Sequence, residues 1–184
     1  MKSMMGLTFA LQVLSSHIEC SLKTNAIPAT FWLVASISCL PEDQRQEVLD
    51  RIQRYIVPET GTKESTVFDI DQLSQDPLLQ SALSETLRLH MNGLMPREIQ
   101  NDTTLTINDR PYHLSKDEWV FLSMAGVHKS ADIYDDPRSF QLKRFVNMHT
   151  KSQGDKFESY KFFTKSGVRV RNPVIWWGGG MHAV

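Results

Sequence analysis

A long uncharged stretch constrains this chain more than any other feature of its sequence. From Thr24 to Pro41 no side chain is charged, and the same is true from Ser3 to Ser16. This pattern predicts a helix over about residues 3–40, which Pro28 should kink because proline removes one backbone donor. So much apolar surface is unfavourable in water, and such a helix therefore needs protein or lipid around most of its circumference.

Two alternatives to a buried helix stay open. Residues 24–41 just reach the length of a membrane span, but Asn25, Ser36 and Ser38 would be poor lipid-facing residues. The earlier stretch follows Lys2 as in a secretory leader, yet no small-x-small cleavage site comes after it. A helix buried inside a protein accounts best for the second stretch.

Composition narrows the class of protein without naming a function. The 184 residues suffice for one domain with its own core, and 20 basic against 21 acidic residues argue against nucleic acid as a partner. The two cysteines, Cys20 and Cys39, are too few for a disulfide scaffold or a four-cysteine zinc site.

The middle of the chain predicts two more helices. One begins at Pro41 and ends before Pro58, and residues 59–75 read as a polar loop. Asp76-Pro77 is a cap followed by a first-turn proline, so the next helix is expected over residues 77–90. Its apolar face consists of four residues, Leu79, Ala82, Leu83 and Leu87.

The later part of the chain is of mixed character. Residues 103–107 and 119–124 have strand composition, and Asn108-Asp109 supplies a turn between them. Regular patterning then fades after Pro137 until residues 168–175. The predicted fold class is therefore mainly α with a small β-sheet.

Glu85 and Arg88 lie three residues apart in the predicted helix over residues 77–90. Helical geometry places them on one face, where they can pair. Apolar residues flank Glu85 at helical spacing, which indicates a buried edge, and a buried pair needs further hydrogen-bond partners to offset its desolvation. The spacing alone leaves a solvated surface pair open as the alternative.

Three motifs, in order along the chain, together resemble the C-terminal part of the cytochrome P450 haem-thiolate family. Residues 84–90 resemble its Glu-x-x-Arg helix, residues 136–145 its Pro-x-x-Phe and Arg-Phe segment, and residues 177–180 the Trp-Gly start of its haem-binding loop. The resemblance implies a partial P450 fold, from the oxygen-groove helix to the start of the haem loop. It also implies a single truncated domain over residues 1–184.

The resemblance assigns roles to six residues. Glu85, Arg88 and Arg144 would form the family's structural triad, since one carboxylate can accept from two planar guanidinium forks. The triad is architectural and does not perform acid–base catalysis. Arg97 and His182 match positions that contact haem propionates; the plain alternatives are a strand-edge arginine and a tail histidine. Gly180 belongs to the haem-binding loop.

The uncharged helix resembles the family's oxygen-groove helix, with a departure. Ile27 and Pro28 stand where the family's acid and threonine would be, so the usual proton-delivery pair is absent. This variant resembles the branch that holds sterol 7α-hydroxylases, prostacyclin synthase and related fungal enzymes. Asn25 would then be the polar group nearest bound oxygen or peroxide.

The expected iron ligand is missing. Counting from Trp177 and Gly180, the cysteine thiolate that binds haem iron should occupy position 184, where Val184 has no donor atom. Neither Cys20 nor Cys39 can substitute by motif. We therefore expect a chain that is inactive alone, without an N-terminal anchor, and either cytoplasmic or adsorbed to membranes.

Family resemblance also predicts the activity of intact relatives. These would be haem-dependent monooxygenases of the endoplasmic reticulum membrane, oxidising an apolar small molecule with electrons from an NADPH-cytochrome reductase, in a setting such as fungal secondary metabolism. Two alternatives remain for this chain. It is a non-enzymatic fragment that binds no haem, or it is related to haem isomerases or dehydratases that need no reductase.

Overall fold

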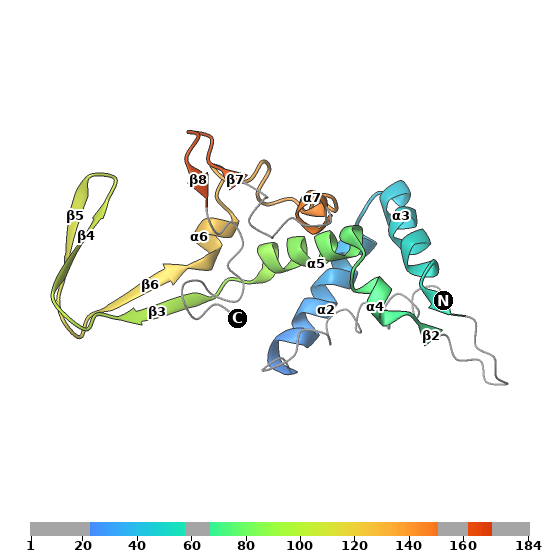
Figure 1. Ribbon diagram of the computed structural model, residues 1–184, viewed down its shortest axis with the longest axis horizontal. Coiled ribbons are helices and arrows are strands. Elements are labelled where there is room, and N and C mark those ends of the chain that lie inside the picture. The colour runs from blue at the N-terminus through green and yellow to red at the C-terminus, as the bar shows by residue number, and fades with distance from the viewer. Residues whose placement is uncertain (1–22, 58–66, 151–161, 171–184) are drawn as a thin grey trace.

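The computed structural model describes residues 23–57, 67–150 and 162–170 (Figure 1). Helices gather at one end of the molecule, and two antiparallel strand pairs extend from them as an arm (Figure 1). This combination of helices and small sheets agrees with the predicted mainly α fold class and with a partial P450 fold.

Helix α2 (Lys23–Ser38) contains Pro28 and continues through it. The predicted helix over residues 3–40 is therefore confirmed over its described part, while residues 3–22 lie outside the described residues. Leu33 and Ile37 are fully buried, whereas Ile27 and Phe31 are 74% and 62% exposed. The helix thus buries one stripe and leaves much apolar surface uncovered.

The two predicted helices that follow are also present. Helix α3 (Glu42–Gln53) begins after Pro41 and buries Val48 and Ile52 against the core. Helix α5 (Pro77–His90) has the predicted bounds, because the Asp76 carboxylate accepts hydrogen bonds from the Leu78 and Leu79 amides at 2.9 and 3.1 Å.

The segment expected to be a polar loop over residues 59–75 is partly regular. Strand β2 (Val67–Phe68) pairs antiparallel with β1 (Ile56–Val57), and helix α4 (Ile70–Leu73) follows, capped by Asp69. Phe68 and Leu73 are buried in the core. Burial of a few apolar side chains has therefore ordered a segment whose polar composition indicated a loop.

The strand pairing expected from the sequence is wrong. Strand β4 (Thr103–Ile107) pairs with β5 (Arg110–Leu114), and β6 (Trp119–Ser123) pairs with β3 (Leu94–Glu98). Asn108 and Asp109 form the β4–β5 turn, both with positive φ, as in the tight turns that suit hairpin twist. The two missed strands, β3 and β5, each contain a proline and show no clear alternation, so composition did not reveal them.

The remaining elements are short and follow the arm. They are α6 (Met124–His128), α7 (Val146–His149), β7 (Phe162–Phe163) and β8 (Arg169–Val170), of which the last two pair antiparallel. In the described part of the chain after Pro137, where the patterning fades, the regular elements are α7, β7 and β8. Within the described ranges, no helix combines the length and apolarity needed to cross a membrane, and this includes α2.

The core lies between α2, α3 and α5. It contains the four predicted face residues of α5, Leu79, Ala82, Leu83 and Leu87, packed with Leu33, Ile37, Val48 and Ile52. Phe145 and Tyr134 are buried near α5 as well, at 0% and 2% exposure. Helix α5 is thus the element around which the helical part is built.

Candidate functional site

Helix α5 carries the candidate site on its last two turns. All eight residues from position 81 to 88 are buried, so the helix is enclosed on every side rather than on one face. Glu85 and Arg88 both lie at 0% exposure. The spacing that predicts a pair on one helical face therefore produces a pair inside the protein.

The Glu85 carboxylate accepts hydrogen bonds from three residues. Arg88 donates through Nε to Oε2 at 2.7 Å and through Nη2 to Oε1 at 2.8 Å, which is a bidentate contact. Arg144, 59 residues later in the chain, donates through Nε to both oxygens at 3.0 and 3.1 Å. The Gln141 amide adds a bond to Oε1 at 3.0 Å.

The two guanidinium groups use their remaining donors on backbone carbonyls. Arg88 Nη1 donates to the carbonyls of His128 at 2.5 Å and Pro137 at 2.7 Å. Arg144 Nη1 donates to the Asp135 carbonyl at 2.7 Å, and its Nη2 donates to the Asp136 carbonyl at 3.2 Å. The cluster therefore ties α5 to α6 and to the irregular segment that follows it.

This geometry limits what the cluster can do chemically. A carboxylate whose oxygens already accept from two guanidinium groups and one amide has no open direction toward a substrate. The side chains are 0%, 0% and 8% exposed for Glu85, Arg88 and Arg144. The arrangement is suited to holding chain segments in place and not to general acid–base chemistry.

Sequence reasoning missed two buried residues beside this cluster. His128, at the end of α6, is fully buried, and burial lowers the pKa of its imidazole, with the nearby Arg88 and Lys129 charges acting in the same direction. Tyr134 is 2% exposed and lies over both guanidinium groups. The sequence signal for Tyr134 is weak: an isolated aromatic before two aspartates in a segment without regular periodicity.

Among the other residues singled out from the sequence, Arg97 has a described side chain, and it lies outside this cluster. Arg97 lies exposed on β3, and its Nη1 donates to the carbonyl of its neighbour Pro96 at 2.8 Å. Asn25 is in the first turn of α2, and its side chain is not among those described. Gly180, His182 and Val184 lie outside the described residues.

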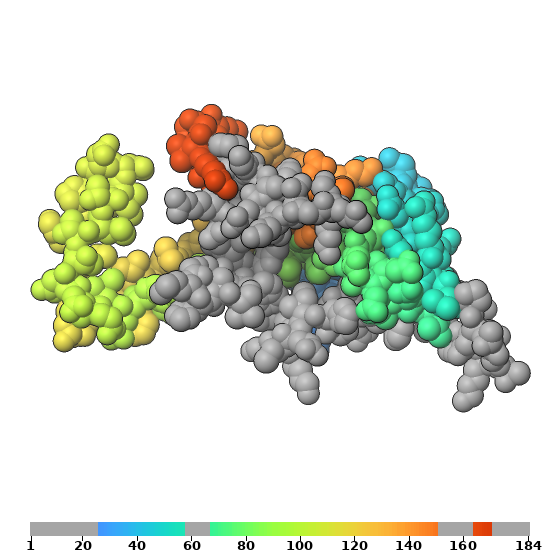
Figure 2. All heavy atoms as spheres, in the orientation of Figure 1, coloured from blue at the N-terminus to red at the C-terminus, as the bar shows by residue number. Residues whose placement is uncertain are grey.

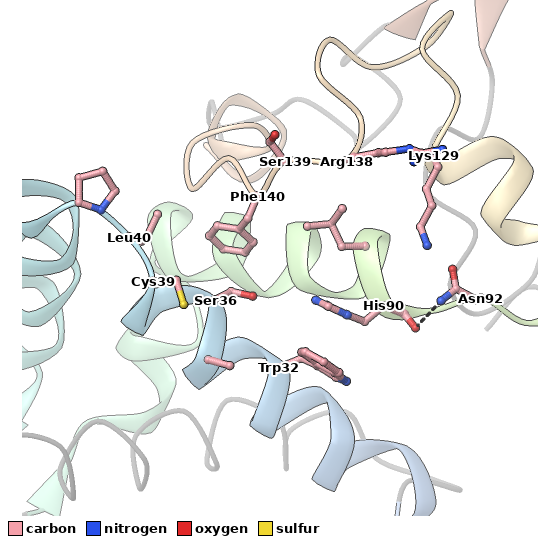
Figure 3. Close-up of a pocket in the computed structure, with 13 residues that line it drawn as sticks. Trp32, Ser36, Cys39, Leu40, His90, Asn92, Lys129, Arg138, Ser139 and Phe140 are labelled. Carbon is pink, nitrogen blue, oxygen red and sulfur yellow. Dashed lines mark hydrogen bonds between the residues drawn. The ribbon is translucent and has the colours of Figure 1, made fainter.

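A pocket of about 980 Å³ opens between α2, α5 and the segment from Lys129 to Phe140 (Figure 3). Lys129 and Arg138 contribute positive charge, and none of the described lining residues is acidic. Trp32, Leu40 and Phe140 supply apolar surface. The pocket is lined by the later turns of α2, beyond Pro28.

Trp32 and His90 form one wall of this pocket. Their rings stack in parallel, with centroids 4.2 Å apart and an interplanar angle of 8°, and Figure 3 shows them facing each other between α2 and α5. Burial lowers the pKa of His90, and the Lys129 charge acts in the same direction. The neutral imidazole is therefore favoured, which suits stacking on an indole.

The fold and the cluster define a helix-rich segment organised around a buried Glu-Arg-Arg contact. Comparison with known proteins agrees with this architecture, since the Cytochrome P450 family model matches residues 44–163, more than half of the chain. The chain therefore belongs to the cytochrome P450 family.

Individual relatives match over most of this chain. It is 32% identical to the 25-hydroxycholesterol 7-alpha-hydroxylase of Rattus norvegicus over 85% of the chain and 36% of the relative. It is 30% identical to the prostacyclin synthase of Bos taurus over 85% of the chain and 30% of the relative. Cytochrome P450 7A1 of Rattus norvegicus is 29% identical over 80% and 31%. The chain spans about a third of the length of these relatives.

Family membership implies haem, and the described residues can be compared with that requirement. Arg97 is an exposed cation of the kind that binds a carboxylate, and it forms no ion pair in the described part of the chain. The position predicted for the iron ligand is occupied by Val184, whose side chain has no donor atom. Among the described residues, no group of three or more His, Cys, Asp or Glu could hold a metal ion. Arg97 therefore fits a propionate contact, and the position predicted for the thiolate lies outside the described residues.

Proposed function

We propose that this chain contains part of the structural framework of a haem-dependent monooxygenase that oxidises an apolar small molecule. The observation that carries the proposal is the buried cluster of Glu85, Arg88 and Arg144, within a chain that belongs to the P450 family. In this proposal the cluster holds the segment from Asp135 to Arg144 against α5 and so positions the chain that leads to the haem-binding loop.

The proposal extends to residues that would approach the cofactor and substrate. Arg97 and His182 would contact haem propionates, Gly180 would lie in the haem-binding loop, and Asn25 would be the polar group nearest oxygen. Electrons would come from an NADPH-cytochrome reductase at the endoplasmic reticulum membrane. A sterol-like substrate is supported by the names of the matched hydroxylases, whereas a role in fungal secondary metabolism rests on motif variants alone.

A further part of the proposal concerns this chain by itself. Without a cysteine at position 184, we propose that it does not bind haem through a thiolate and has no monooxygenase activity. A haem titration followed by reduction and addition of carbon monoxide tests this, since only a thiolate ligand produces the family's characteristic band. We expect no such band for the wild-type chain. Its appearance would show that the chain does bind haem through a thiolate and would refute the proposal.

Two variants make the titration specific. Val184→Cys places a thiol at the predicted ligand position, and a thiolate-type band that appears only in this variant would support the assignment of position 184. Cys39→Ser removes an exposed thiol that could ligate haem adventitiously. A band lost in the Cys39→Ser variant would therefore point to Cys39 and not to the haem loop.

A haem isomerase or dehydratase is the second candidate. It is favoured by the 30% identity to bovine prostacyclin synthase and by Ile27 and Pro28 at the positions of the usual acid and threonine. Turnover of a peroxide substrate by a haem-loaded Val184→Cys chain without reductase would support this class. Turnover that requires reductase and oxygen would support the monooxygenase.

A further inference from the structure

The buried cluster on α5 contains more positive than negative charge. Two guanidinium groups, Arg88 and Arg144, share the single carboxylate of Glu85. Asp135 and Asp136 lie close by in the chain, but the contacts they make with Arg144 are through their backbone carbonyls. Burying an unmatched charge is costly, so the surplus cation requires compensation from the groups that enclose it.

Tyr134 is placed to provide part of this compensation. Its ring centroid lies 4.9 Å from Cζ of Arg88 and 5.7 Å from Cζ of Arg144, and the residue is 2% exposed. The face of an aromatic ring carries negative potential, and the attraction to a cation strengthens when water is excluded. One ring therefore meets both cations of the cluster in a desolvated setting.

The ring is held in this place by its surroundings. Phe145 packs edge to face against Tyr134, with centroids 6.3 Å apart and an interplanar angle of 76°. Phe145 is itself anchored to α5, because its amide donates to the Ser81 hydroxyl at 2.9 Å. Two residues after Tyr134, Asp136 has a φ of 45°, and this left-handed turn is one that aspartate tolerates.

We propose that Tyr134 is a positioning residue of the cluster, whose ring face offsets the surplus positive charge and keeps both guanidinium groups directed at Glu85. The segment from Tyr134 to Asp136 then makes two kinds of contact with the cluster. The Tyr134 ring faces both arginines, and the carbonyls of Asp135 and Asp136 accept from Arg144. This inference rests on the described contacts alone and does not depend on haem binding. A failure to bind haem would leave this inference unaffected, and a failure of this inference would leave the proposal on haem unaffected.

The experiment varies the electron density of the ring while keeping its shape. Tyr134→Phe in the full chain is the reference, and mono-, di- and trifluorinated phenylalanines are then placed at position 134. Fluorine weakens the negative potential of the ring face. We expect the equilibrium constant for unfolding to rise stepwise with each fluorine, by roughly tenfold over the series, as loss of a desolvated cation–π contact implies.

A second comparison and a control separate electrostatics from packing. Tyr134→Leu should be less stable than Tyr134→Phe, so that only the aromatic replacement rescues the cluster. The same fluorinated series at Phe140, a half-buried ring with no stacked cation in the described contacts, should give a flat response. A flat series at position 134, or equal slopes at 134 and 140, would overturn the proposal.

Discussion

The charge on Glu85 can lie fully inside the protein because donors from three residues are directed at its oxygens. Two guanidinium groups and one backbone amide surround its two oxygens at 2.7 to 3.1 Å. Such an arrangement is compensated as a unit, and removing one member leaves the others unpaired in a dry environment. Individual residues of the cluster therefore contribute to stability far more than surface ion pairs do.

Glu85→Gln should strongly destabilise the chain. The amide keeps the shape but removes the negative charge between two buried cations, which should cost about 3–5 kcal/mol in the free energy of unfolding. Glu47→Gln is the matched control, because Glu47 pairs with Lys143 at 2.7 Å at a much more exposed position and should cost about 1 kcal/mol or less. Urea denaturation measures both, and equal losses would contradict this prediction.

The buried imidazole of His128 should make stability depend on pH. Burial lowers its pKa from 6.5 in the folded protein, so the unfolded chain binds a proton at pH values where the folded protein does not. Stability from this group is complete above about pH 6.5 and is lost as the pH falls below that value.

His128→Gln should reduce this pH dependence. The slope of unfolding free energy against pH just below 6.5 should decrease by up to about 1.4 kcal/mol per pH unit. Part of the slope should remain, because burial also lowers the pKa values of His90 and His149. Denaturation midpoints measured from pH 7.5 to pH 5 test the change, and an unchanged slope in the variant would show that His128 is not responsible.

Helix α5 shows how an element can be specified locally and still depend on its neighbours. Asp76 caps its N-terminus, and the same carboxylate accepts from the Tyr55 hydroxyl at 2.7 Å and from Arg51 at 3.2 Å. Arg51 lies in α3, and Tyr55 lies in the turn directly after that helix. One side chain thus starts α5 and connects it to the preceding helix.

Asp76→Ala should cost about 2–3 kcal/mol in the free energy of unfolding, since it removes a cap and leaves buried donors unsatisfied. Asp76→Asn keeps an acceptor for the helix amides and should recover about half of that loss. The control is Asp69→Ala, which removes the cap of the short helix α4 and should cost about 1 kcal/mol. Thermal or urea unfolding of the three variants distinguishes them, and an Asp76→Ala loss no larger than that of Asp69→Ala would be inconsistent with a bridging role.

Helices and strands differed in how far the sequence determined them. The bounds of α5 could be predicted because its cap, its first-turn proline and its apolar repeat are all local signals. The partner of β6 could not be predicted, because the β4–β5 hairpin separates β3 from β6 in the chain and no local signal links the two strands. The turn at Asn108-Asp109 was recognised, but the strand that it leads into was not.

At the scale of the whole molecule, the strand arm stands apart from the helices, and Figure 2 shows its outer part clear of the rest of the molecule. One face of the β3–β6 pair presents Leu94, Trp119 and Phe121, at 60%, 56% and 58% exposure. Apolar surface grouped in this way promotes association in water. The arm therefore contributes little to the core and much to the behaviour of the chain in solution.

Phe121→Lys should weaken self-association of the chain. Removing one large apolar side chain from the face of β6 should raise the dissociation constant by roughly tenfold, because burial of such a residue contributes about 1.5–3 kcal/mol. Thr106→Lys adds the same charge on β4 at an exposed polar position and should change association less. Sedimentation velocity at several concentrations measures both, and equal effects would mean that net charge, not the apolar face, governs association.

The sequence by itself determined the family, the α5 helix and the pairing of Glu85 with Arg88, because a separation of three residues in a helix places side chains together whatever surrounds them. Only the tertiary structure decided that this pair is fully buried, that Arg144 and the Gln141 amide complete it, and that Tyr134 covers both cations. Of these, the contacts made with Glu85 and Arg88 join segments more than 45 residues apart, as the 59-residue separation of Glu85 and Arg144 illustrates. Their positions depend on how the irregular segment packs against α5, and no local periodicity encodes that packing.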